Sequence, residues 1–161
     1  MATTTNKAKA IPDGYHSVTP YLCIKGAKQA LDFYQKAFGA EVIYKLEMPD
    51  GRLGHAELQI GNSRLMLSDE MPEMPDAITR SPSTLRGSTV GLAVYIEDVD
   101  ARFQQAVKAG AKVRRPVTNQ FYGDRSGTVE DPFGHFWTIS THVEDVSPDE
   151  IMKRAAKMAG G

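Results

Sequence analysis

The chain has 161 residues, of which 41% are hydrophobic and 24% are charged, and its formal net charge is -1. This length suits one domain, or two small modules that share a core. A net charge so close to zero provides no electrostatic attraction for DNA, RNA or an anionic membrane, so we expect no nucleic-acid or membrane partner. Cys23 is the single cysteine, which excludes an internal disulfide and is typical of a reducing compartment. We therefore expect a cytoplasmic protein.

The first module is expected over residues 17–69, after a flexible N-terminal tail over residues 1–16. Alternation predicts a strand over residues 18–24, with Val18, Leu22 and Ile24 packed against the helices. Apolar residues at helical spacing predict a helix that Gly39 ends. The remaining elements complete a strand, helix, strand, strand, strand order: the helix over 27–38 and strands over 41–47, 53–60 and 63–68.

The second module is expected over residues 89–142, after a connecting loop over 70–88 that is rich in Pro, Met, Ser and Thr. Asp98 is a suitable N-cap for its helix, and Gly110 ends that helix. Ser147 followed by Pro148 predicts the start of a C-terminal helix over 147–160. The elements of the second module are a strand over 90–96, a helix over 99–109 and strands over 112–117, 127–130 and 136–141.

The two modules share letters as well as order. Gly39-Ala40-Glu41-Val42 recurs as Gly110-Ala111-Lys112-Val113, and Ile24 and Ile96 close the two first strands. Coincidence within a plain α+β domain is the alternative. We favour duplication of a βαβββ unit, because the order of elements, the glycine stops and the spacing agree.

Several short motifs stand out along the chain. They are Ala30-Leu31-Asp32-Phe33-Tyr34, Phe38-Gly39-Ala40, Asp131-Pro132-Phe133-Gly134-His135, Thr19-Pro20-Tyr21-Leu22, His55-Ala56-Glu57-Leu58, Phe121-Tyr122-Gly123-Asp124-Arg125 and Thr141-His142-Val143-Glu144-Asp145-Val146-Ser147. Together they resemble the glyoxalase/bleomycin-resistance group of the vicinal oxygen chelate superfamily, and within it the PhnB-like subgroup. The resemblance implies an α+β fold of two βαβββ modules, which form a curved mixed sheet of eight strands around a cavity, with the helices outside. It implies no catalytic activity by itself, because one fold hosts many functions.

Metal-using members of this superfamily hold a divalent ion with four side chains, usually His and Glu. The resemblance places the corresponding positions at Thr19, Met66, Leu92 and Thr138. None of these residues is a good ligand for a hard or borderline divalent ion. We therefore expect no metal at this site and no other cofactor.

His55 and Glu57 are the best candidates for chemistry. Alternation along their strand places them on the cavity side together with Gln59. Such a pair can act as an acid/base couple or bind a relocated metal. The alternative is a hydrogen-bonded polar pair that lines a wet cavity or a subunit interface.

The segment from Tyr122 to Arg125 resembles the loop that enters the second-module pocket of bleomycin-binding relatives. An aromatic ring there can stack on a planar ligand, and Arg125 can pair with a carboxylate or phosphate. The alternative is a surface ion pair of Arg125 with Asp124 or Glu130. For His142 and Glu144 we expect a structural role in docking the last helix.

These observations lead to a protein that binds a small organic molecule in a metal-free cavity, for instance to sequester a toxic compound, and that forms a homodimer. One alternative is a lyase- or isomerase-type enzyme of the same superfamily that uses His55 and Glu57, with or without a relocated metal. Another is a dimeric scaffold without catalysis. The expected ligand-binding residues are Thr19, Tyr21, His55, Glu57, Met66, Leu92, Tyr122, Arg125, Phe136 and Thr138.

Overall fold

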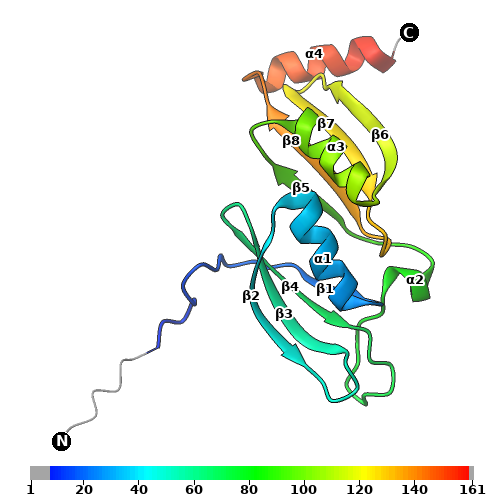
Figure 1. Ribbon diagram of the computed structural model, residues 1–161. Coiled ribbons are helices and arrows are strands. Elements are labelled where there is room, and N and C mark those ends of the chain that lie inside the picture. The colour runs from blue at the N-terminus through cyan, green and yellow to red at the C-terminus, as the bar shows by residue number, and fades with distance from the viewer. Residues whose placement is uncertain (1–7, 160–161) are drawn as a thin grey trace, which may run out of the picture.

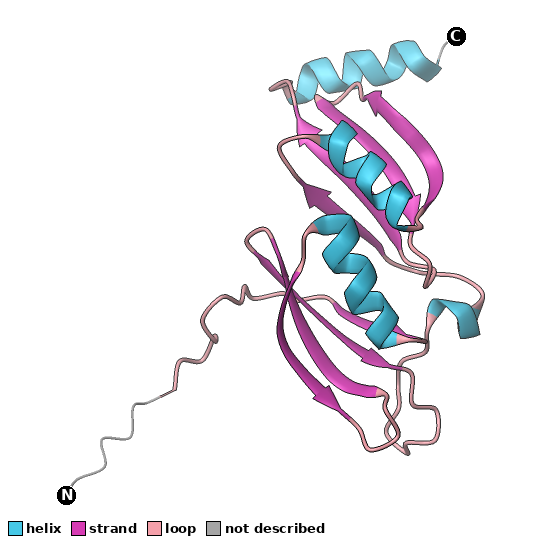
Figure 2. Ribbon diagram, viewed as in Figure 1, coloured by secondary structure: helices cyan, strands magenta, loops and turns pink. Residues whose placement is uncertain are grey.

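The computed structural model describes residues 8–159, so the first seven residues of the expected tail and the end of the expected last helix lie outside it. The described chain folds into two similar halves, each with one long helix packed on one four-stranded sheet (Figures 1 and 2). The elements are β1 (Tyr21–Ile24), α1 (Ala27–Phe38), β2 (Glu41–Glu47), β3 (Leu53–Ile60), β4 (Ser63–Asp69), α2 (Pro82–Leu85), β5 (Gly91–Tyr95), α3 (Val99–Ala109), β6 (Lys112–Asn119), β7 (Asp124–Glu130), β8 (Phe136–His142) and α4 (Pro148–Ala159).

The two sheets have the same topology. Their strand orders are β1-β4-β3-β2 and β5-β8-β7-β6, with the first pair of each sheet parallel and the others antiparallel. The α+β class with two βαβββ modules is therefore confirmed. Strand pairing stops at the junction within the described residues, so the eight strands form two sheets that are not joined by a backbone ladder.

The long helices form where the sequence predicts them. The apolar face of α1 is buried, and Gly39 ends this helix in the left-handed conformation with its N–H donated to the carbonyl of Gln35. In α3 the side chain of Asp98 accepts from the N–H of Ala101, and Gly110 ends the helix. Both helices cover the same side of the molecule and contact each other, which joins the modules (Figure 1).

A buried carboxylate also joins the modules. Asp131, 2% exposed in the turn between β7 and β8, accepts hydrogen bonds from Tyr34 Oη on α1 at 2.7 Å and from Trp137 Nε1 on β8 at 3.0 Å. The backbone N–H groups of Phe133 and His135 also donate to it, both at 2.9 Å. Its negative charge raises the pKa of Tyr34, although burial of the phenol contributes most. The turn between β7 and β8 therefore supplies a polar joint in the core.

Several strand bounds differ from the prediction by one to three residues, the two largest shifts being at the starts of β1 and β7, and the connecting loop holds an unpredicted helix. β1 begins at Tyr21, and Val18, which alternation places against the helices, is 85% exposed because the parallel ladder with β4 covers only residues 21–24. β7 begins at Asp124, three residues early, since its pairing with β8 extends to His142. The connecting loop contains the short helix α2, capped by Ser81, whose hydroxyl also donates to Glu70.

Among residues 8–159, no helix is long and apolar enough to span a membrane.

Candidate functional site

Each sheet has one face packed on a long helix and an opposite face that no helix of residues 8–159 covers, which we call the open face (Figures 1 and 2). The strand register determines which residues lie there. In the first module Tyr21 and Glu57 both pair with Met66, and His55 lies two residues before Glu57 on β3. Ala56 and Leu58, between and beyond them, are buried on the helix side. The open face of the first module thus brings together four of the expected ligand-binding residues.

Three of these residues form a hydrogen-bonded chain. The hydroxyl of Tyr21 lies 2.9 Å from His55 Nδ1, and His55 Nε2 lies 3.3 Å from Glu57 Oε1. An ionised carboxylate only accepts, so Nε2 must donate to Glu57. In the neutral imidazole Nδ1 is then the acceptor, and Tyr21 donates its proton to it. Because Tyr21 is half exposed, this chain ends at a hydroxyl that a ligand can reach.

Two further residues hold Glu57 in its ionised form. The Tyr15 hydroxyl, the His55 ring and the Arg64 guanidinium lower the pKa of Glu57, in that order of importance. In return, burial and the carboxylate raise the pKa of Tyr15 to about 12. The Arg64 guanidinium lies 5.7 Å from the centre of the Tyr15 ring and packs beneath Gly14. Glu57 is therefore a fixed negative charge behind His55.

The open face of the second module has different chemistry. Phe136 and Thr138 lie there in a hollow of about 700 Å³, which also reaches Arg115 on β6 and Thr128 on β7. The hydroxyls of Thr128 and Thr138 are 3.2 Å apart. This hollow is lined by arginine and hydroxyl groups, whereas histidine and glutamate lie on the open face of the first module.

Leu92 does not lie on the face where the resemblance places it. The resemblance predicts it in the cavity, but it pairs with Trp137 and packs on the core at the helix side, so the neighbours that lie on the open face are Gly91, Ala93 and Tyr95. Its expected place on the same face as Phe136 and Thr138 is therefore wrong, because adjacent residues of a strand point to opposite faces.

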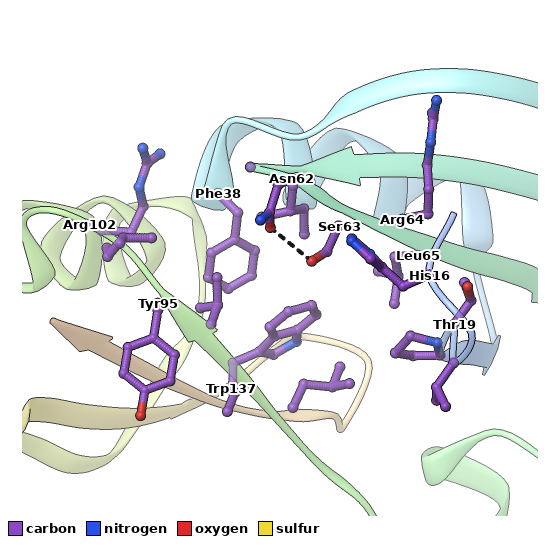
Figure 3. Close-up of a pocket in the computed structure, with 18 residues that line it drawn as sticks. His16, Thr19, Phe38, Asn62, Ser63, Arg64, Leu65, Tyr95, Arg102 and Trp137 are labelled. Atoms are coloured by element: carbon purple, nitrogen blue, oxygen red, sulfur yellow. Dashed lines mark hydrogen bonds between the residues drawn. The ribbon is translucent and has the colours of Figure 1, made fainter. Parts of the chain in front are cut away.

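Thr19 and Leu92 instead line a cavity of about 660 Å³ at the junction of the modules. Its walls are largely apolar and include Phe38, Leu65 and Trp137. Figure 3 shows the rings of Phe38 and Trp137 at its centre, while the guanidinium groups of Arg64 and Arg102 extend away from them. This cavity lies apart from the Tyr21, His55 and Glu57 chain, none of whose residues line it.

Tyr122 and Arg125 do not join either open face. Tyr122 stacks edge-on against Phe121 with ring centroids 5.2 Å apart. Arg125 forms a two-pronged ion pair with Asp100 on α3, with both N–O distances at 2.7 Å, and also donates to Asn119. A surface ion pair of Arg125 therefore exists, but its partner is Asp100 because Arg125 lies on the helix side of β7.

The positions that carry metal ligands elsewhere do not converge here. Met66 and Thr138 lie on different sheets, Leu92 packs on the core, and Thr19 precedes β1. Their hydroxyl, thioether and aliphatic side chains do not suit a divalent ion. Within residues 8–159 no group of three His, Cys, Asp or Glu side chains is placed to hold a metal. The residues present therefore do not fit the metal that the fold implies.

A comparison with known families decides the classification. The sequence profile of the Glyoxalase/Bleomycin resistance protein/Dioxygenase superfamily matches residues 15–139. The chain belongs to this superfamily. The match spans both modules, so the repeat is part of the family fold.

The chain is also similar to individual relatives and solved structures. Uncharacterized protein Mb0911c from Mycobacterium bovis is 39% identical over 145 residues, which cover 90% of this chain and 95% of that protein. TioX from Micromonospora sp. ML1 matches with a TM-score of 0.60 and 23% identity over 80% of this chain and 99% of TioX. A PhnB protein from Bacillus cereus matches with a TM-score of 0.59 and 18% identity over 78% of this chain and 99% of its own. The two structures, at such identities, show the fold alone.

Cys23 lies on the open-face side of β1 but is buried. Burial is also the main reason that the pKa of its thiol is raised, which disfavours the thiolate needed for nucleophilic attack. Cys23 therefore behaves as a small apolar residue.

A second polar network lies at the far end of the second module. His142 Nδ1 lies 2.8 Å from buried Asp124, and its Nε2 lies 2.9 Å from Asp145, while Tyr95 Oη donates to Asp124 at 2.7 Å. Neutral imidazole can donate to only one carboxylate, so this arrangement favours the protonated ring. The two carboxylates, Asp124 first, raise the pKa of His142. Glu144 nearby binds Arg154 of α4, so the expected docking role of this segment is present.

The network predicts a pH dependence of stability. Because the pKa of His142 is raised in the folded state, its stabilising contribution is complete below the ordinary histidine pKa and is lost as pH rises through the raised value. We expect the melting temperature of the wild type to exceed that of His142→Gln at pH 5.5, and the difference to shrink by pH 9. Calorimetry of both proteins at the two pH values measures this. A difference that is constant or grows with pH would contradict the assignment.

Sequence reasoning missed Tyr15, Arg64 and Arg115. Tyr15 falls in the expected tail, where no periodicity gives a signal. Arg64 shares the parity of Met66 on β4, so alternation was sufficient to find it. Arg115 lies on the open face only because of an irregularity in β6, which alternation does not predict.

Proposed function

We propose that this protein binds a small organic molecule on the open face of its first module, through Tyr21, His55 and Glu57 and without a metal. The observation that carries the proposal is the hydrogen-bonded chain on a sheet face that no helix covers. A ligand site needs apolar surface with a few oriented polar groups. Met66 and the half-exposed ring of Tyr44 beside His55 supply the apolar part.

A second copy of the chain is the proposed cover for the open faces. Tyr21 and Tyr44 on the first face and Tyr95 on the second are 50%, 50% and 64% exposed, which is high for aromatic residues of a folded domain. Pairing two copies would bury these rings and enclose a ligand. We therefore also propose that the protein is a homodimer and that it is cytoplasmic. We further propose that it belongs to the PhnB-like subgroup, which the motifs around Tyr21 and His55 support.

Acid/base catalysis at the same site is a second candidate. Glu57 orients the imidazole, and the Nδ1 lone pair faces a hydroxyl, which is the arrangement that general-base catalysis requires. Sequestration, by contrast, needs no proton acceptor at this position. A ligand hydroxyl that replaces Tyr21 as the donor to Nδ1 would lose its proton to His55, and the resulting imidazolium would be stabilised by Glu57.

Native mass spectrometry of the purified protein tests the proposal, because it detects any small molecule that co-purifies with the chain. We expect a bound small molecule in the wild type and its loss, with the fold retained, in His55→Gln. The matched histidine variant is His16→Gln, since His16 lines the junction cavity and takes no part in the hydrogen bonds of Tyr21, His55 and Glu57. A molecule that remains bound in His55→Gln and is lost on filling the junction cavity by Leu65→Trp would place the site there instead. If the wild type converted that molecule chemically and His55→Gln did not, acid/base catalysis would be the favoured function.

A further inference from the structure

The open face of the second module has a feature that the proposed function does not use. The hollow of about 700 Å³ adjoins another of about 390 Å³, and the two share Arg114 and Phe136. We call this combined concavity the basin. Three arginines line it, Arg86, Arg114 and Arg115, against one carboxylate, Glu130.

The charges in the basin do not cancel. Arg114 Nε donates to Glu130 at 2.6 Å, so that pair is neutral. Arg86 and Arg115 have no carboxylate within 4.0 Å among the described residues. Most other arginines of the described chain are paired: Arg52, Arg80, Arg125 and Arg154 each have an acidic partner. A chain with a net charge of -1 therefore concentrates two unpaired positive charges in one concavity.

A β-bulge creates this concentration. Val113 pairs with Val129 and Arg115 pairs with Thr128, so two steps on β6 correspond to one step on β7. The extra residue brings consecutive arginines, Arg114 and Arg115, to the same hollow, where a regular strand would separate them onto opposite faces. The corresponding step on β2, from Val42 to Tyr44, has the same irregularity but carries no charge.

The rest of the lining suits an oxyanion attached to an apolar body. The hydroxyl of Thr89 and one of the two paired hydroxyls of Thr128 and Thr138 can donate to anionic oxygens, and Phe136 and Val90 supply apolar contact. The guanidinium group of arginine matches a carboxylate or phosphate with two parallel hydrogen bonds.

We propose that the basin binds the carboxylate or phosphate group of a small molecule, with Arg115 as the principal contact and Arg86 as the second. This proposal rests on the proposed function. One end of the ligand would contact Tyr21 and His55, and its anionic end would bind in the basin. The first module then supplies proton-transfer groups and the second supplies anion recognition.

Two-dimensional ¹H–¹⁵N NMR titration of the full chain with inorganic phosphate and with benzoate tests the basin. We expect saturable shifts at Arg115, Thr128 and Thr138 with at least one of the two anions, and an affinity about tenfold weaker in Arg115→Gln. Arg115→Lys keeps the charge but not the planar fork, so its affinity is expected to lie between the two. Lys108→Gln on α3 removes the same charge outside the basin, and its affinity is expected to stay within twofold of the wild type.

Absence of saturable shifts with either anion up to about 20 mM, or an equal loss in Lys108→Gln and Arg115→Gln, would overturn the basin. The spectrum itself reports whether each variant is folded. His55→Gln separates the two proposals. Anion binding that persists in this variant supports a basin that binds the anion without help from His55. Failure of ligand binding at His55 with an intact anion response would reject the proposed function and retain the basin.

Discussion

Replacing Asp131 by alanine is expected to lower the free energy of unfolding by about 3–5 kcal/mol. The substitution leaves four donors without this acceptor: three are buried, the Tyr34 hydroxyl, the Trp137 indole and the His135 N–H, and the Phe133 N–H is half-buried. It also breaks the polar joint between α1 and the second sheet. Urea unfolding followed by the fluorescence of Trp137, the single tryptophan, measures the effect at the joint itself.

Asp32→Ala is the matched control, since Asp32 is an exposed carboxylate on α1. Its effect should stay within about 0.5 kcal/mol. If Asp131→Ala cost less than about 1 kcal/mol, the four hydrogen bonds would not be the joint that we describe. A three-state transition in this variant would indicate that the modules unfold separately once the joint is lost.

Gly123→Ala is expected to be the other severe substitution, with a loss of about 3 kcal/mol or more. Gly123 has φ = 103°, which alanine rarely adopts, and an added Cβ would lie 2.1 Å from the carbonyl oxygen of Glu144. The carbonyl of Gly123 also accepts from Val143 and Glu144. The linker between β8 and α4 must therefore move, and the pair between Glu144 and Arg154 is expected to loosen.

Gly51→Ala separates the two causes. Gly51 has φ = 86°, but nothing lies within 4 Å of an added Cβ, so only the backbone strain applies. We expect about 1 kcal/mol for this control in thermal or urea unfolding. Equal losses at Gly51 and Gly123 would show that the contact with Glu144 is not limiting.

The elements that sequence predicts best are those with a local stop signal. α1 and α3 have the predicted bounds, because their apolar spacing is regular and Gly39 and Gly110 end them. β2 and β3 also have the predicted bounds. The hydrogen bond from Tyr34 to Asp131 was not predicted, because it joins residues that are far apart in the chain.

Part of the candidate site followed from alternation and part did not. His55, Glu57 and Tyr21 share a face because β1 and β3 are regular where they pair with Met66. Leu92 was predicted on the open face but lies on the helix side, and Arg115 escaped prediction because it follows a bulge. The ion-pair partner of Arg125 was not predicted, because Asp100 lies on α3 and not on the same strand as Arg125.

Ligand-observed NMR of the wild type against a library of small phenols, carbonyl compounds and organic acids tests the central claim most directly. The same library is then measured with Tyr21→Phe, His55→Gln and the control His16→Gln. We expect compounds that bind the wild type and His16→Gln equally, bind Tyr21→Phe more weakly, and bind His55→Gln about tenfold more weakly or not at all. Compounds that bind all four proteins equally would show that the chain of Tyr21, His55 and Glu57 is not the ligand site.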